Sequence, residues 1–118
     1  MKSYSGDVIR GTGRATALGF PTLNIKLGDA HLSGIYAGTV ECNAIVYSAA
    51  LYADQERGIL ESHLLEPAPR VDATIIVTPL KKIREKKNFK TKKELEEAIQ
   101  EDIQNIKDFF VTLRGSVL

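Results

Sequence analysis

The sequence predicts a mainly β fold, a small closed barrel of short strands followed by one C-terminal α-helix. Three observations favour it. Several short segments alternate apolar and polar residues, turn residues separate these segments, and a helical repeat replaces the alternation after residue 90. Short strands with frequent turns are typical of small barrels. The chain has no internal repeat and no linker, so we expect a single domain over residues 1–118.

The N-terminal half is expected to contribute strands. Residues 4–9 form a short mixed segment, and the stretch that contains Thr22 and Asn24 is extended. Residues 34–42 alternate apolar and polar side chains, and residues 44–52 follow directly after Asn43, which favours a turn. These two segments therefore predict a β-hairpin.

The next strands lead up to the helix. A polar loop over residues 53–58 ends in glycine and precedes a strand over 59–65, and Pro67 and Pro69 then interrupt regular pairing. Residues 70–78 are rich in β-branched side chains and predict another strand. The charged segment 81–89 is expected to be an edge strand.

The helix begins at a capping box, with the Thr91 hydroxyl at the cap and Glu94 three residues later. Gly115 is a suitable stop. We expect the helix to cover one face or end of the sheet and to have no catalytic duty. Its apolar face is formed by residues three or four apart, namely Leu95, Ile99, Ile103, Ile106, Phe110 and Leu113.

Composition narrows the classes of function. Sixteen Lys and Arg residues against fifteen Asp and Glu give a net charge of +1, so there is no electrostatic reason to expect a nucleic-acid partner. The single cysteine, Cys42, excludes an intrachain disulfide and fits a reducing compartment. No signal peptide or membrane-spanning stretch is visible, so we expect a cytoplasmic protein without a membrane partner.

The glycine-rich tract over residues 11–24 is the most informative stretch for chemistry. Glycines let backbone N–H groups come close to a ligand, and successive N–H groups attract anions such as phosphate. Thr22 and Asn24 are two residues apart, so on an extended segment their oxygens lie on one side, as ligands that Mg²⁺ accepts beside substrate phosphates. The alternative interpretation is a glycine-rich turn into a strand, with Pro21 at its edge.

Glu61 is the best candidate for an acid–base residue, because it interrupts an otherwise apolar strand. Alternation places Glu61 on the same face as His63. Glu61 then either belongs to a functional face or points to solvent. His63 either contacts the substrate or has a structural role. The basic cluster between Lys81 and Lys93 is either a solvated surface or a region that steers an anionic nucleotide.

Four segments in this order resemble the riboflavin kinase family. They are the tract over 11–24, which ends in Gly-Phe-Pro-Thr-Leu-Asn, then Gly-Ile-Tyr-Ala at 34–37, Glu-Ser-His-Leu-Leu at 61–65 and Ile-Arg-Glu-Lys-Lys-Asn-Phe at 83–89. The resemblance covers nearly the whole chain and implies a six-stranded Greek-key β-barrel with the helix packed against it. It also implies ATP-dependent, Mg²⁺-dependent phosphorylation of the riboflavin 5′-hydroxyl to give FMN.

The resemblance also implies roles for single residues. Thr22 and Asn24 hold Mg²⁺ and the transferring phosphoryl group, and Glu61 takes the proton from the ribityl hydroxyl as general base. Tyr36 and His63 are further candidates for contact with the substrate. The residues expected to bind ATP or its phosphates are Gly11, Gly13, Arg14, Gly19, Pro21, Thr22 and Asn24.

The function predicted first is therefore a monofunctional riboflavin kinase that acts on riboflavin and ATP and releases FMN and ADP. These 118 residues do not include the adenylyltransferase domain that often precedes such a module, so FAD synthesis is not expected, and a monomer is expected for a closed barrel. One alternative is a module of the same descent that binds flavin or nucleotide without turning it over. Another is a small barrel for protein interaction, which would bind neither.

Overall fold

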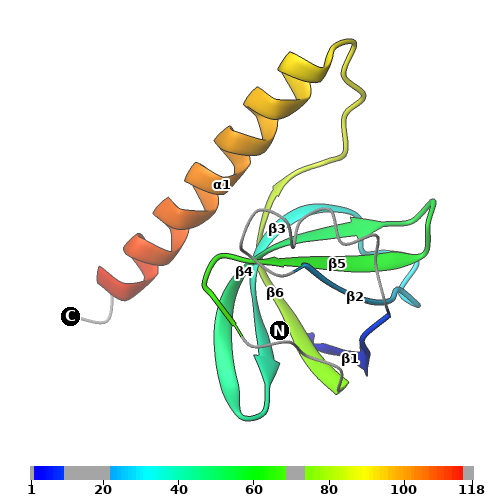
Figure 1. Ribbon diagram of the computed structural model, residues 1–118, viewed down its shortest axis with the longest axis vertical. Coiled ribbons are helices and arrows are strands. Elements are labelled where there is room, and N and C mark those ends of the chain that lie inside the picture. The colour runs from blue at the N-terminus through cyan, green and yellow to red at the C-terminus, as the bar shows by residue number, and fades with distance from the viewer. Residues whose placement is uncertain (1, 10–21, 69–73, 116–118) are drawn as a thin grey trace.

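The computed structural model describes residues 2–9, 22–68 and 74–115 and contains six strands and one helix in these ranges (Figure 1). The helix lies beside the barrel, and the connection that leads into it rises away from the last strand. The elements are β1 (Tyr4–Asp7), β2 (Thr22–Lys26), β3 (Gly34–Cys42), β4 (Ile45–Asp54), β5 (Ile59–Leu64), β6 (Thr74–Arg84) and α1 (Lys92–Gly115).

The six strands form one antiparallel sheet in the order β1-β6-β3-β4-β5-β2. Strands β3, β4 and β5 follow one another, and β6 returns to lie beside β3, which is the Greek-key arrangement. The two outer strands come close to closing the barrel, because Ile9, just after β1, donates its N–H to the carbonyl oxygen of Asn24 in β2 at 2.7 Å. The predicted six-stranded Greek-key barrel with a C-terminal helix is confirmed.

The β3–β4 hairpin turns where the sequence predicts it. Asn43 and Ala44 both have positive φ, 53° and 66°, and form the two-residue turn that suits the twist of antiparallel strands. The next turn ends at Gly58, which also has a positive φ of 65°. Local turn chemistry thus fixes the register of β3, β4 and β5.

Strand β6 differs from the prediction. The sequence suggested two strands around Pro79, whereas the structure has one continuous strand over Thr74–Arg84, and residues 85–90 lie in no strand. Pro79 is tolerated because the register with β3 shifts between Ala37 and Gly38, opposite this proline. An added Cβ at Gly38 would lie 2.5 Å from the carbonyl oxygen of Thr78, so the close approach of the strands requires glycine.

The barrel interior is filled by side chains from the inner faces of the strands. Ile25, Leu51, Leu60, Ile75 and Val77 are fully or almost fully buried there. Burial of aliphatic side chains of this kind is the main driving force for the fold.

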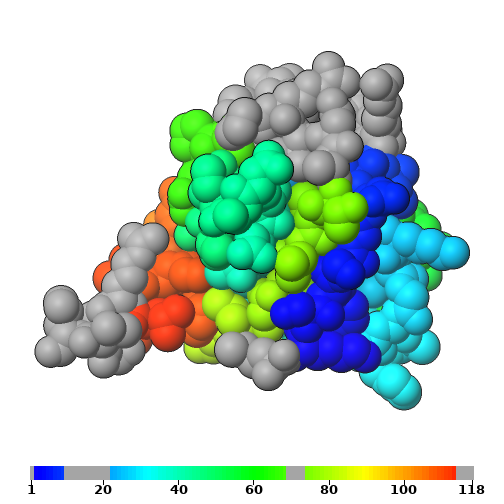
Figure 2. All heavy atoms as spheres, turned by 90° about the horizontal axis from the view of Figure 1, so that it is seen from below, coloured from blue at the N-terminus to red at the C-terminus, as the bar shows by residue number. Residues whose placement is uncertain are grey.

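Helix α1 packs on the outside of the barrel through its C-terminal half. Ile106 and Phe110 bury against Ala37 of β3. Figure 2 shows this half of the helix against the β3–β4 hairpin and β6, with β1 on the other side of β6. At the N-terminus the predicted cap is present, because the Glu94 N–H donates to the Thr91 hydroxyl at 3.2 Å. The one helix in the described ranges lacks an apolar stretch long enough to cross a membrane.

Candidate active site

The outer face of β2 and β5 brings the predicted chemical groups together. Asn24 is the direct cross-strand partner of Glu61, and Thr22 is the partner of His63. Side chains at directly paired positions point to the same face of a sheet. The alternate residues of β5, among them the buried Ser62, point into the barrel. Thr22, Asn24, Glu61 and His63 therefore form one cluster on the outside of the barrel, which we call the polar cluster.

Three of the four members of the polar cluster, Thr22, Glu61 and His63, line a groove of about 440 Å³ between the barrel and α1. The helix contributes the apolar wall opposite them, through Leu95, Ile99 and Ile103. Leu95 and Ile99 remain 42% and 45% exposed, so this wall is apolar surface open to a ligand. The remainder of the lining comes from the barrel wall and the β6–α1 connection: Ile35, Ala50, Leu51, Tyr52, Arg84, Lys86, Lys87, Phe89 and Asp102.

The Glu61 carboxylate is partly exposed to solvent and pairs with a guanidinium group. Its side chain is 31% exposed, and its Oε2 lies 3.6 Å from Nη2 of Arg57, in the turn before β5. Arg57 is itself fixed by Asp54, whose Oδ2 accepts a hydrogen bond from Arg57 Nε at 2.5 Å. Asp54 also accepts the backbone N–H groups of Glu56 and Arg57, so the turn that carries the guanidinium is well ordered. The Glu61 carboxylate therefore has a charged neighbour that orients it, and one exposed side that faces the groove.

His63 lies beside the Thr22 hydroxyl, with Thr22 Oγ1 and His63 Nδ1 3.3 Å apart. Partial burial lowers the pKa of His63 below its usual value of 6.5, and the nearby Glu61 charge opposes this shift only in part. The ring is therefore neutral at pH 7, and Nδ1 is able to accept a hydrogen bond from the Thr22 hydroxyl. In that arrangement the Thr22 oxygen keeps its lone pairs for another ligand.

Asn24 carries a buried acceptor with an unmet hydrogen-bonding capacity. The residue is only 7% exposed, and its Oδ1 accepts no hydrogen bond from the part of the chain that the structure describes. A buried amide oxygen without a partner is costly, and such groups in proteins often await an ion or ligand. The amide oxygen of Asn24 and the hydroxyl oxygen of Thr22 are both hard ligands of the kind that Mg²⁺ prefers.

A Mg²⁺ ion bound at Thr22 and Asn24 would need phosphate oxygens of the substrate to complete its coordination. Within the described residues no group of three or more His, Cys, Asp or Glu side chains forms a metal site. Mg²⁺ commonly binds through one or two protein oxygens together with phosphate oxygens. Thr22 and Asn24 match that pattern, whereas an all-protein cage does not exist among the described residues.

The other predicted residues fall into two groups. Tyr36 faces the opposite side of the sheet from the polar cluster, because its β4 partner is the inward-pointing Leu51 and it packs against the barrel core. Its neighbour Ile35 lines the groove instead. Five residues predicted to bind phosphate lie outside the described residues, namely Gly11, Gly13, Arg14, Gly19 and Pro21.

Sequence reasoning missed several groups in the groove. Arg57 lies in a segment that the sequence predicted only as a polar loop, and nothing in its spacing points to Glu61. Arg84 and Phe89 lie in the last of the four segments that carry the family resemblance, which was the one available signal for them. The helix was expected to have no catalytic duty, and the structure places three of its apolar residues in the groove wall.

Comparison with known proteins supplies the family. The sequence matches the flavokinase family, described as riboflavin kinase, over residues 2–110. The chain belongs to the flavokinase family.

Two curated relatives of this flavokinase domain carry the name bifunctional riboflavin kinase/FMN adenylyltransferase. The protein from Bacillus subtilis (strain 168) is 30% identical over 122 residues, which cover 92% of this chain and 39% of the relative. The protein from Buchnera aphidicola subsp. Schizaphis graminum (strain Sg) is 31% identical over 120 residues, which cover 92% of this chain and 38% of the relative. The chain thus spans less than half the length of either relative.

A solved structure supports the fold of the flavokinase domain. It is a crystal structure named as a macrolide-efflux protein from Streptococcus pneumoniae, with a TM-score of 0.74 and 21% sequence identity. The similarity covers 89% of this chain and 36% of that protein. At this identity the likeness shows the shared barrel and helix alone.

Proposed function

We propose that this protein is a riboflavin kinase, which transfers the γ-phosphate of ATP to the 5′-hydroxyl of riboflavin and yields FMN and ADP. Membership of the flavokinase family supports the proposal. The single observation that carries it is the pairing of β2 with β5, which sets Asn24 directly beside Glu61, a residue that lines the groove. A metal-and-phosphate side and a carboxylate side are what phosphoryl transfer to an alcohol needs.

The groove suits a substrate with a flat apolar end and a hydroxylated tail. Leu95, Ile99 and Phe89 offer an apolar and aromatic surface for a fused ring system, and binding there would cover the exposed part of the helix wall. The polar cluster lies across the groove from that wall. A ribityl chain that runs from the ring toward β5 would bring its terminal hydroxyl to Glu61.

Glu61 is proposed as the proton acceptor for that hydroxyl. A carboxylate in hydrogen-bond reach of the alcohol orients its oxygen toward the phosphorus atom and takes the proton as the new O–P bond forms. Arg57 holds one carboxylate oxygen, so the other is free to face the alcohol. We expect positioning to contribute at least as much as proton removal, because phosphoryl transfer depends mainly on alignment and charge stabilisation.

Thr22 and Asn24 are proposed to hold the Mg²⁺ of the nucleotide complex. When bound, the ion would neutralise charge on the phosphate oxygens. The side-chain oxygens of Thr22 and Asn24 supply the protein part of its coordination, and His63 turns the Thr22 hydroxyl so that its oxygen is available. The loop from Gly11 to Gly19, with Arg14 and Pro21, remains the proposed binding segment for the ATP phosphates.

The expected compartment, oligomeric state and partners stay the same. The lone Cys42 fits a reducing compartment, and we propose a cytoplasmic monomer whose partners are riboflavin, FMN, ATP and ADP.

A direct product assay tests the function. The protein is incubated with riboflavin, ATP and Mg²⁺, and FMN is separated from riboflavin by chromatography, with parallel reactions that lack ATP or contain EDTA. We expect FMN only in the complete reaction. Riboflavin or nucleotide binding without FMN would instead support the module that does not turn over, and binding of neither would contradict the proposal.

A further inference from the structure

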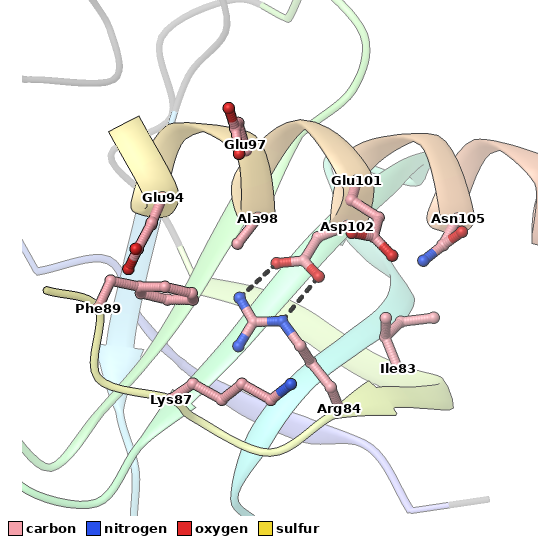
Figure 3. Close-up of a pocket in the computed structure, with 10 residues that line it drawn as sticks. All are labelled: Ile83, Arg84, Lys87, Phe89, Glu94, Glu97, Ala98, Glu101, Asp102 and Asn105. Atoms are coloured by element: carbon pink, nitrogen blue, oxygen red, sulfur yellow. Dashed lines mark hydrogen bonds and ion pairs between the residues drawn. The ribbon is translucent and has the colours of Figure 1, made fainter. Parts of the chain in front are cut away.

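The Arg84–Asp102 ion pair is the strongest polar contact between the barrel and the helix among the described residues. Arg84 is the last residue of β6, and its Nε and Nη2 donate to the two carboxylate oxygens of Asp102 at 2.8 Å and 2.6 Å. The side chains are only 20% and 11% exposed. Figure 3 shows the guanidinium and carboxylate facing each other in this two-pronged geometry. Paired hydrogen bonds between charged groups fix orientation as well as distance.

Arg84 also reaches the connection between β6 and the helix. The Phe89 ring lies beside its guanidinium, with the centroid 5.7 Å from Cζ, and Arg84 Nη1 donates to the Glu85 carbonyl oxygen at 3.1 Å. One side chain therefore ties together the barrel, the connection and the helix. Arg84, Phe89 and Asp102 all line the groove that faces the polar cluster.

The ion pair matters for the position of the helix because the two halves of α1 pack against the barrel to different extents. Ile106 and Phe110 anchor the C-terminal half on the barrel. Toward the N-terminus, Leu95 and Ile99 are about half exposed and have no comparable packing against the described residues of the barrel. Asp102 stands between these two halves, one turn before Ile106. The ion pair is thus the last firm attachment before the part of the helix wall that Leu95 and Ile99 form.

We propose that Arg84 and Asp102 form a positioning clasp, which holds the N-terminal half of α1 over the groove as the binding wall for the flavin ring. The flavin part of this inference rests on the proposed function. Within the described part of the chain, neither Arg84 nor Asp102 forms a hydrogen bond or ion pair with the polar cluster, so the clasp acts on substrate placement and not on the transfer step itself. A wall displaced by about 1 Å is enough to change binding or rate by orders of magnitude.

The test compares Asp102→Asn with Glu97→Gln, a control that removes one negative charge from the same helix five residues earlier. Two measurements are made on the wild type and each variant, well below their melting temperatures. They are hydrogen–deuterium exchange of α1, and riboflavin affinity from quenching of flavin fluorescence. We expect Asp102→Asn to speed exchange of residues 92–101 by about tenfold or more, while residues 103–113 change little. Riboflavin Kd and KM should rise by about tenfold to a hundredfold, with KM for ATP almost unchanged. The control should match the wild type.

A purely structural role makes a different prediction. The melting temperature would fall, while local exchange of residues 92–101 and riboflavin affinity stayed at wild-type values, and that result would overturn the clasp. If the wild type binds no riboflavin, the proposed function fails, and the exchange measurement still decides whether the clasp exists. Should Asp102→Asn not fold, Arg84→Lys keeps the charge without the two-pronged geometry, and the same two measurements on that variant decide the matter.

Discussion

Asn24→Leu should stabilise the ligand-free protein and abolish its response to magnesium nucleotide. The buried Oδ1 of Asn24 has no partner among the described residues, and such an unmet acceptor costs about 1–3 kcal/mol. Replacing the amide by methyl groups of the same branching removes that cost. We expect the free energy of unfolding to rise by about 1–2 kcal/mol, or roughly 4–8 °C in melting temperature for a domain of this size.

The stabilisation by Mg·ADP is expected to be lost in Asn24→Leu. With Mg·ADP at about a hundred times its Kd, the wild type should gain about 2.7 kcal/mol of stability, because the ligand binds only the folded state. Asn24→Leu should gain almost nothing. Melting curves by circular dichroism, recorded with and without Mg·ADP, give both quantities from one experiment.

Two further variants control for size and charge. Asn105→Leu makes the same exchange on an exposed part of α1 and should keep the full Mg·ADP shift. Asn24→Asp buries a carboxylate beside Glu61, so it should be less stable than wild type without metal and recover stability when Mg²⁺ is added. A wild-type Mg·ADP shift in Asn24→Leu would refute the assignment of Asn24 as a metal-holding residue.

Three other predictions concern the polar cluster and the barrel. His63→Leu should raise the Mg²⁺ concentration for half-maximal activity by about tenfold or more, whereas His63→Asn, which keeps an acceptor near Thr22, should not, and equal values in both variants would contradict the orienting role. The Tyr4 hydroxyl donates to Asp29, which raises the pKa of Tyr4 to about 12, so its stabilisation is complete below pH 10 and is lost as the pH rises toward 12. Urea titrations at several alkaline pH values should show this loss in the wild type and not in Tyr4→Phe. Ser62→Ala removes a fully buried hydroxyl that has no partner among the described residues, so it should raise stability by about 1 kcal/mol, and a clear loss in urea denaturation would contradict this.

Features set by neighbouring residues could be predicted from the sequence. The hairpin turn at Asn43 and the cap at Thr91 depend on side chains a few positions apart, and both are present. The shared face of Glu61 and His63 follows from alternation within one strand. The sequence left open whether that face is functional, and the family resemblance favoured the functional interpretation.

Features set by distant contacts could not be predicted from the sequence. Continuity of β6 through Pro79 depends on a register shift opposite Gly38 in β3, which no local pattern reveals. The groove exists because α1 docks through Ile106 and Phe110, while residues from its other half line the groove together with Glu61 and His63. Tyr36 illustrates the same limit, since only the register of β3 shows that its side chain lies on the other face from the polar cluster, and its contact with substrate stays a prediction.

The most direct test of the account is the phosphoryl-transfer rate of Glu61→Gln, measured with saturating riboflavin and Mg·ATP beside Glu41→Gln, a carboxylate on β3 that does not line the groove. We expect Glu61→Gln to lower kcat by about a hundredfold to ten-thousandfold, while Kd for Mg·ADP and the melting temperature stay near wild type. Wild-type kcat in Glu61→Gln would contradict the claim that this carboxylate meets the alcohol opposite the metal-holding side chains.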